Sequence, residues 1–120
     1  MKRLALCALT AAAVAATGAT AVQAKTTLKL RADGKGALKF NKETLRARPG
    51  TVTIRLTNPS TSGKPHAVEI EGKGQEKRSK VIDSGGTATV SIKLVKGTYE
   101  FYCPVGNHKA AGMEGKLIVK

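Results

Sequence analysis

Short segments in which apolar and polar residues alternate recur along the chain, and they constrain its fold more than any other feature. Gly, Pro, Asn and Asp fill the intervals between them. No segment keeps a sustained helical period, and only residues 41–48 are expected to form one short helical turn. The pattern predicts an all-β sandwich in a single domain. The expected strands are residues 26–31, 37–40, 52–57, 66–70, 88–94, 98–103 and 116–119.

The first 24 residues differ from the rest of the chain. Two basic residues precede an apolar run over residues 4–16, and a Val-Gln-Ala sequence ending at Ala24 supplies small residues for cleavage. The run is too short to cross a bilayer as a helix. We therefore expect residues 1–24 to be a signal peptide, with cleavage after Ala21 as the second choice. Residues 25–120 would then be exported to the periplasm, the cell envelope or the extracellular space.

The chain is strongly basic, with 21 Lys and Arg against 8 Asp and Glu. Its basic residues are spread along the chain and alternate with apolar positions, as expected of solvated strand faces. Only four aromatic residues are present, all Phe or Tyr, which is too few for a platform that stacks single-stranded nucleic acid. We therefore exclude nucleic acid as a partner. The charge favours acidic redox proteins or an anionic membrane surface.

Beyond residue 24 the chain contains one Cys, two His and one Met: Cys103, His66, His108 and Met113. Four residues separate Cys103 from His108, and four more separate His108 from Met113. A thiolate, two imidazoles and a thioether form the donor set that suits copper in an electron-transfer site. An exported thiol without a disulfide partner is open to oxidation, and coordination to a metal would protect it.

Alternation also predicts where the candidate ligands point. It places His66 on the inward face of its strand and Glu69 on the outward face. Cys103 lies on the inward face at the end of the penultimate strand. The loop before the last strand carries His108 and Met113 and can fold over the same end of the sandwich.

These residues resemble the cupredoxins, the blue-copper proteins of the plastocyanin and azurin family. The resemblance spans residues 25–120 and is most specific in PHAVEI and in the ending GTYEFYCPVGNHKAAGMEGKLIVK. It implies a cupredoxin-like Greek-key β-sandwich of about seven to eight strands that holds one copper ion at one end. It also implies a type 1 centre that carries single electrons between redox partners, with Tyr99 as a structural corner. The implied metal ligands are His66, Cys103, His108 and Met113.

Two positions depart from the family pattern. Ala67 stands where the family usually has an Asn that ties the ligand loops together, although its backbone amide can still donate toward the sulfur of Cys103. Gly106-Asn107 replaces a Pro-Gly pair before the loop histidine, and both residues tolerate positive φ. Because hydrogen bonds around the ligands hold their geometry, we expect a looser site.

Other functions remain alternatives at this point. The same ligands would serve a periplasmic copper carrier or chaperone. A nitrite reductase or multicopper oxidase needs further histidines, which the chain lacks, and structural zinc sites rarely use Met. A metal-free interaction module would require the ligand pattern to be accidental. No nucleophile, general base or carboxylate pair surrounds an open site, so we expect a monomeric protein that is not an enzyme.

Overall fold

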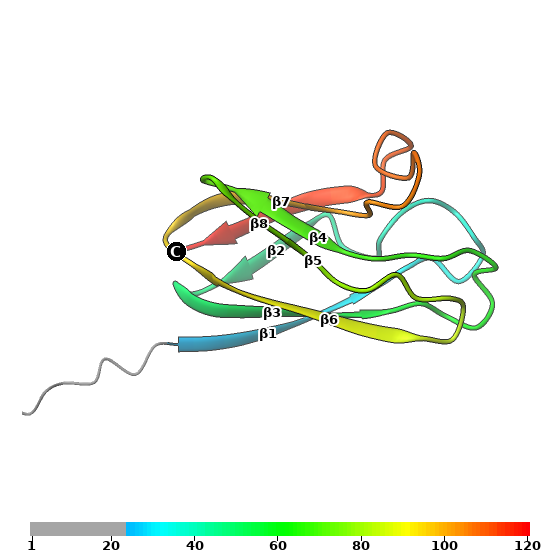
Figure 1. Ribbon diagram of the computed structural model, residues 1–120, viewed down its shortest axis with the longest axis horizontal. Helices are drawn as coiled ribbons and strands as arrows, with labels where there is room; N and C mark the ends of the chain where they lie inside the picture. The colour runs from blue at the N-terminus through cyan, green and yellow to red at the C-terminus, as the bar shows by residue number, and fades with distance from the viewer. Residues whose placement is uncertain (1–23) are drawn as a thin grey trace, which may run out of the picture.

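The computed structural model describes residues 24–120, which form a sandwich of two β-sheets (Figure 1). The predicted signal peptide lies outside the described residues except for Ala24, which begins the first strand. Among the described residues there is no helix long and apolar enough to cross a membrane. The strands are β1 Ala24–Arg31, β2 Thr44–Ala47, β3 Gly50–Thr57, β4 Glu69–Gly72, β5 Gln75–Arg78, β6 Thr87–Leu94, β7 Gly97–Tyr102 and β8 Glu114–Val119.

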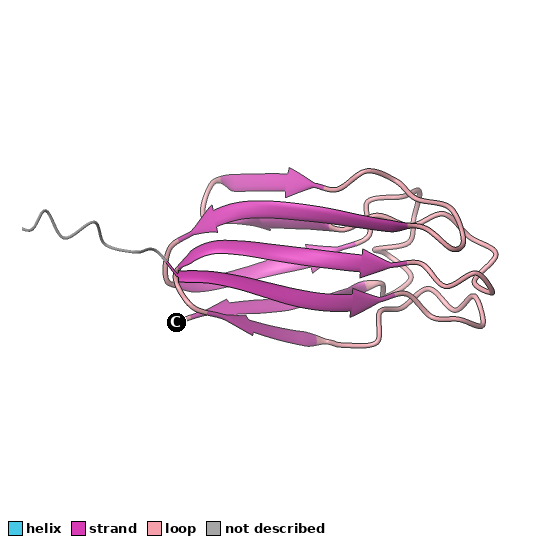
Figure 2. Ribbon diagram, turned by 90° about the horizontal axis from the view of Figure 1, so that it is seen from below, coloured by secondary structure: helices cyan, strands magenta, loops and turns pink. Residues whose placement is uncertain are grey.

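The strands divide into a three-stranded sheet, in the order β1-β3-β6, and a five-stranded sheet, in the order β2-β8-β7-β4-β5. β1 pairs with β3 and β2 pairs with β8 in parallel, whereas the other pairs are antiparallel. Figure 2 shows the three-stranded sheet in front, with the longer loops gathered at one end of the sandwich. The predicted all-β sandwich is confirmed.

The core lies between the inner faces of the two sheets. Val52, Ile54 and Leu56 alternate with more exposed residues along β3, and each is fully buried. Phe101 on β7 packs against Phe40 with ring centroids 5.7 Å apart. Burial of such apolar side chains is the main favourable term in folding, so alternation along the strands largely determines this architecture.

The structure corrects three details of the predicted elements. Residues 41–48 contain β2 rather than a helical turn, because Leu45 and Ala47 are buried with the two-residue period of a strand. Residues 37–40 form no strand, only an isolated bridge between Phe40 and Ala32. β5 was missed because all four of its residues are polar and exposed.

Candidate metal centre

His66 lies in an isolated bridge rather than in the predicted strand, because β4 begins three residues later. Its backbone N–H donates to the carbonyl of Ile82 at 3.0 Å, and its carbonyl accepts from the amide of Ile82 at 2.8 Å. The side chain is fully buried, as alternation predicts. The bridge fixes the main chain on which the imidazole is mounted.

A buried amide next to this bridge was not identified from the sequence. The side-chain nitrogen of Asn58, which is fully buried, donates to the carbonyls of Lys64 at 2.7 Å and Ile82 at 3.0 Å. Its oxygen accepts from the hydroxyl of Ser62, which also lies 3.1 Å from that of Ser84. We call Asn58, Ser62 and Ser84 the Asn58 network. It ties together the segments on both sides of His66, although Ala67 supplies no such link.

Cys103 directly follows β7 and opens the ligand loop, defined here as residues 104–113. The amide of Cys103 donates to the carbonyl of Met113 at 3.0 Å and closes the base of the loop. Inside it, the amides of His108 and Met113 donate to the carbonyls of Val105 and His108. Gly106, with φ +48°, adopts the left-handed conformation that the predicted turn needs.

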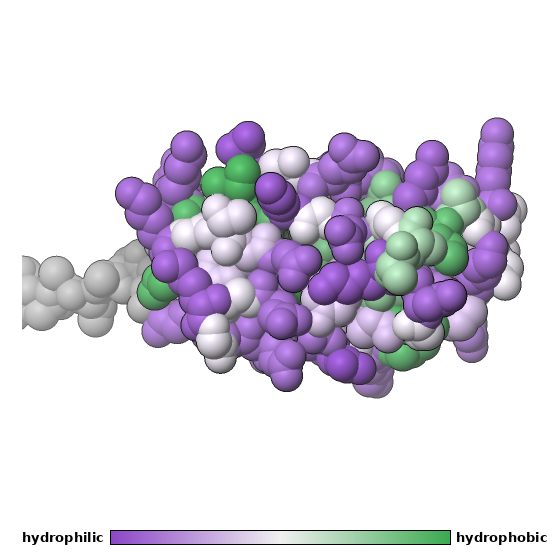
Figure 3. All heavy atoms as spheres, turned by 90° about the horizontal axis from the view of Figure 1, so that it is seen from above, coloured by the Kyte–Doolittle hydropathy of each residue, from purple (hydrophilic) through white to green (hydrophobic). Residues whose placement is uncertain are grey.

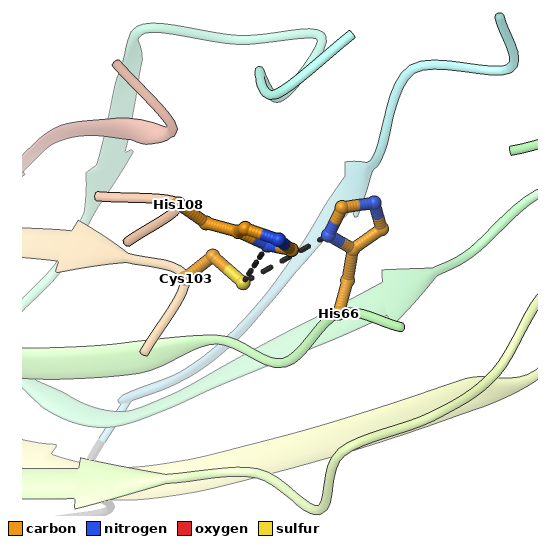
Figure 4. A group of neighbouring side chains, drawn as sticks. All are labelled: His66, Cys103 and His108. Atoms are coloured by element: carbon orange, nitrogen blue, oxygen red, sulfur yellow. Dashed lines mark hydrogen bonds between the residues drawn. The ribbon is translucent and has the colours of Figure 1, made fainter. Parts of the chain in front are cut away.

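Three of the predicted ligands converge (Figure 4). The Cys103 Sγ atom lies 3.4 Å from Nδ1 of His108 and 3.8 Å from Nδ1 of His66. A metal held about 2.3 Å from a thiolate and about 2.0 Å from each imidazole, with ligands about 120° apart, would separate sulfur from nitrogen by about 3.7 Å. The observed distances lie on either side of this value, so the cluster fits one metal ion.

Met113 belongs to the same cluster through its main chain. Its amide donates to the carbonyl of His108, and its carbonyl accepts from the amide of Cys103, so it is bonded to two of the predicted ligands. Its side chain is fully buried, so the thioether is kept away from solvent at the loop end of the core. The structure thus brings all four predicted residues to one end of the sandwich.

Burial dominates the electrostatics of the cluster. It raises the pKa of the Cys103 thiol, and the backbone amides of Ala67 and Val105 oppose that rise. Burial, followed by the nearby His108 and Lys64, lowers the pKa of His66 to about 4. Nε2 of His66 is buried without a hydrogen-bond partner, whereas Nδ1 faces the sulfur. At neutral pH the site therefore presents a neutral imidazole, and a cation bound there would offset the burial of a thiolate.

Glu69 points away from the core as predicted, but it is only 2% exposed. The hydroxyl of Tyr102 lies 2.6 Å from a carboxylate oxygen of Glu69 and 2.6 Å from one of Glu71. The other carboxylate oxygen of Glu69 lies 2.9 Å from the guanidinium of Arg78. Burial and these carboxylates raise the pKa of Tyr102. The ammonium of Lys109 lies 4.0 Å from the ring centroid of Tyr102. This cluster therefore braces the ligand loop from the outer face of the five-stranded sheet.

The rim of the ligand loop is partly apolar. Pro104 and Val105 are half-buried, whereas Ala110 and Ala111 are exposed. Figure 3 views the five-stranded sheet, and one gathering of apolar atoms lies at the end of the molecule that carries the loop. His108 is half-buried in this rim, so it is the more accessible of the two histidines.

Fold and site together define a small β-sandwich with a buried Cys-His-His metal site closed by a Met-containing loop. The chain belongs to the cupredoxin-like domain family, whose model matches residues 4–119. The resemblance identified from the sequence is thereby confirmed. No curated protein matches the sequence significantly.

Solved structures share the fold. Auracyanin A of Chloroflexus aurantiacus, a blue copper protein, is 24% identical with a TM-score of 0.69, covering 81% of this chain and 100% of that one. Reduced auracyanin of Roseiflexus castenholzii is 22% identical with a TM-score of 0.69, covering 81% and 98%. Copper nitrite reductase of Nitrosomonas europaea is 23% identical with a TM-score of 0.67, covering 81% of this chain but 42% of that one. The similar structures are thus mainly small blue copper proteins, with some larger copper enzymes among them.

Proposed function

We propose that this chain is a type 1 copper protein that carries single electrons between redox partners outside the cytoplasm. The observation that carries the proposal is the convergence of Nδ1 of His66 and Nδ1 of His108 on the sulfur of Cys103. Met113 would complete the donor set with its thioether sulfur. A bound copper ion would supply the one-electron couple between Cu(II) and Cu(I).

The protein fixes the positions of the donor atoms and excludes water from them. Cys103, Met113 and His66 have no exposed surface, which supports a resident metal rather than one handed over through accessible ligands. This burial favours the electron carrier over the copper carrier that the sequence alone left open. His108, in its apolar rim, would offer partners the closest approach to the metal.

The same architecture supports a carrier rather than an enzyme. Both histidines face the sulfur of Cys103, so neither is free to act as a general base.

The proposal that the protein is exported depends on the signal-peptide pattern of residues 1–24, and we propose that the mature domain begins at Lys25. Mass spectrometry of the protein recovered from the cell envelope tests this, and a chain that retains residues 1–24 would contradict it.

The first experiment is a titration of the copper-free protein with Cu(II), followed by optical and EPR spectroscopy. We expect one equivalent to produce an intense visible thiolate-to-copper band and narrow copper hyperfine splitting. His108→Ala should lose this signal, whereas Asn107→Ala, an exposed neighbour without an observed side-chain hydrogen bond, should keep it. A colourless wild-type protein, or wild-type colour in His108→Ala, would contradict the proposal. Rapid loss of copper to a Cu(I) chelator would instead favour the copper carrier.

A further inference from the structure

The outer face of the three-stranded sheet carries polar side chains only. Register pairing along β1, β3 and β6 aligns its residues in rows across the sheet. All of them are exposed or half-buried. We call this set the cationic face, and it consists of Lys25, Thr27, Lys29 and Arg31 on β1, Thr51, Thr53, Arg55 and Thr57 on β3, and Thr87, Thr89, Ser91 and Lys93 on β6.

Five Lys and Arg side chains lie on the cationic face among seven hydroxyl side chains, without any Asp or Glu. None of the five makes a salt bridge among the described residues. Every glutamate of the chain lies instead in the five-stranded sheet or immediately before it, at positions 43, 69, 71, 76, 100 and 114. Asp33 and Asp83 lie in loops, so the strands of the three-stranded sheet carry no acidic side chain, whereas the five-stranded sheet carries both acidic and basic ones.

The positive surface continues around the edge of β1. One shallow hollow there is lined by Lys25, Arg46, Arg48 and Lys120, without an acidic residue. A second hollow is lined by Lys29, Arg31 and Arg55 of the cationic face together with Lys42, again without an acidic residue. The basic residues thus form one continuous surface rather than isolated charges.

We propose that the cationic face binds the surface of an anionic lipid bilayer. Its side chains cover an area of about 20 Å by 10 Å, judged from the spacing of residues and strands in a sheet. A planar anionic partner can meet all five cations together, whereas a compact ligand would reach only some of them. Threonine and serine hydroxyls can donate hydrogen bonds to headgroup phosphates. The face has no aromatic or large apolar side chain, so it fits binding at the surface without insertion.

The position of the face leaves the metal centre free. The cationic face is a flank of the sandwich (Figure 2), whereas the ligand loop lies at one end of the strands (Figure 1). A molecule bound through this flank would lie with its strands along the bilayer. His108 would then remain open to a redox partner beside it.

The test is cosedimentation with phospholipid vesicles of the protein recovered from the cell envelope, with its leader removed. One set of vesicles contains 30% phosphatidylglycerol in phosphatidylcholine, and the other contains phosphatidylcholine alone. Each basic residue near an anionic bilayer changes binding by about fivefold, so Lys29→Gln/Lys93→Gln should weaken binding about thirtyfold. The matched control Lys77→Gln/Lys116→Gln removes the same charge from the five-stranded sheet and should weaken binding far less. Added salt should release the wild-type protein.

Three results would overturn the proposal. The first is that the wild-type protein does not cosediment with anionic vesicles at low salt. The second is equal weakening in the two double variants, which would show that only net charge matters. The third is face-dependent binding to soluble polyglutamate without binding to vesicles, which would make the face a docking surface for acidic proteins.

Discussion

The two histidines of the metal centre are held in opposite ways. His66 is fully buried and lies beside the Asn58 network. Its main-chain N–H and carbonyl both form hydrogen bonds with the main chain of Ile82. His108 is half-buried in a loop whose main-chain hydrogen bonds stay within residues 103–114. One side of the site is thus fixed by the sandwich, and the other by a short local turn. His66 thus gives the site rigidity, whereas His108 gives a partner access to it.

The largest expected effect comes from breaking the fixed side. Asn58→Ala removes three hydrogen bonds of a buried amide, two to the carbonyls of Lys64 and Ile82 and one from the hydroxyl of Ser62, which should destabilise the copper-free protein by about 3 kcal/mol. Urea denaturation measures the change. Asn107→Ala in the ligand loop is the control and should cost less than about 0.5 kcal/mol. Similar losses in both variants would mean that the two sides are not held differently.

Low pH should also lower the stability of the copper-free protein through His66, on the fixed side of the site. The pKa of His66 is about 4 in the folded protein and near 6.5 when unfolded, so between these values only the unfolded chain takes up this proton. As pH falls from 6.5 to 4, the copper-free protein should lose about 3 kcal/mol of stability through this group.

Variants separate this contribution from those of the carboxylates. Denaturation at pH 7 and pH 4 should show a smaller pH dependence in His66→Gln than in the wild type. Asn107→Ala, an exposed substitution in the ligand loop, should retain the wild-type dependence. An unchanged pH dependence in His66→Gln would show that His66 does not carry this effect.

A smaller effect is expected from the loop side. Gly106 has φ +48°, and a Cβ added to it would meet no atom within 4 Å, so Gly106→Ala incurs only a backbone penalty of about 1 kcal/mol. Gly106→Asn, which tolerates this conformation, should cost less. Thermal unfolding measures both, and a loss above about 3 kcal/mol would show that the loop is coupled to the core.

The smallest effect concerns the charge on the ligand loop. Lys109 lies 3.5 Å from Glu100 in a partly exposed ion pair, so Lys109→Glu should change stability by less than about 1 kcal/mol. If acidic redox partners approach this end, the ionic-strength dependence of electron exchange should weaken or reverse. Stopped-flow kinetics at several salt concentrations would detect this. An unchanged dependence would place partner steering elsewhere on the protein.

The sequence predicts the metal cluster well because its information is local. Cys103 and His108 are five residues apart, and two-residue alternation places Cys103 and His66 on inward faces. The resemblance to the cupredoxins also implied that Tyr99 is a structural corner, and its hydroxyl donates to the carbonyl of Val95 at 2.7 Å. The inferences about Cys103, His108 and His66 instead depend on a strand period or a short turn.

What the sequence missed depends on contacts between distant segments. The role of Asn58 arises because the carbonyls of residues 64 and 82 meet beside it, which no local pattern encodes. The expectation of a looser site rested on Ala67 alone and did not include this network. β5 gave no signal because an exposed edge strand needs no apolar face. Glu69 points outward as alternation predicts, yet Tyr102 and Arg78 cover it.

The hydrogen bond from the amide of Cys103 to the carbonyl of Met113 closes the ligand loop at its base. Inside that closure, the main chain of the loop depends on itself and little on the strands below. Substitutions at the exposed positions of the loop can therefore alter the metal's surroundings while the sandwich stays the same. In evolution, the redox properties of the centre can therefore vary independently of the stability of the fold. Related proteins can differ in the ligand loop while they keep the same sandwich.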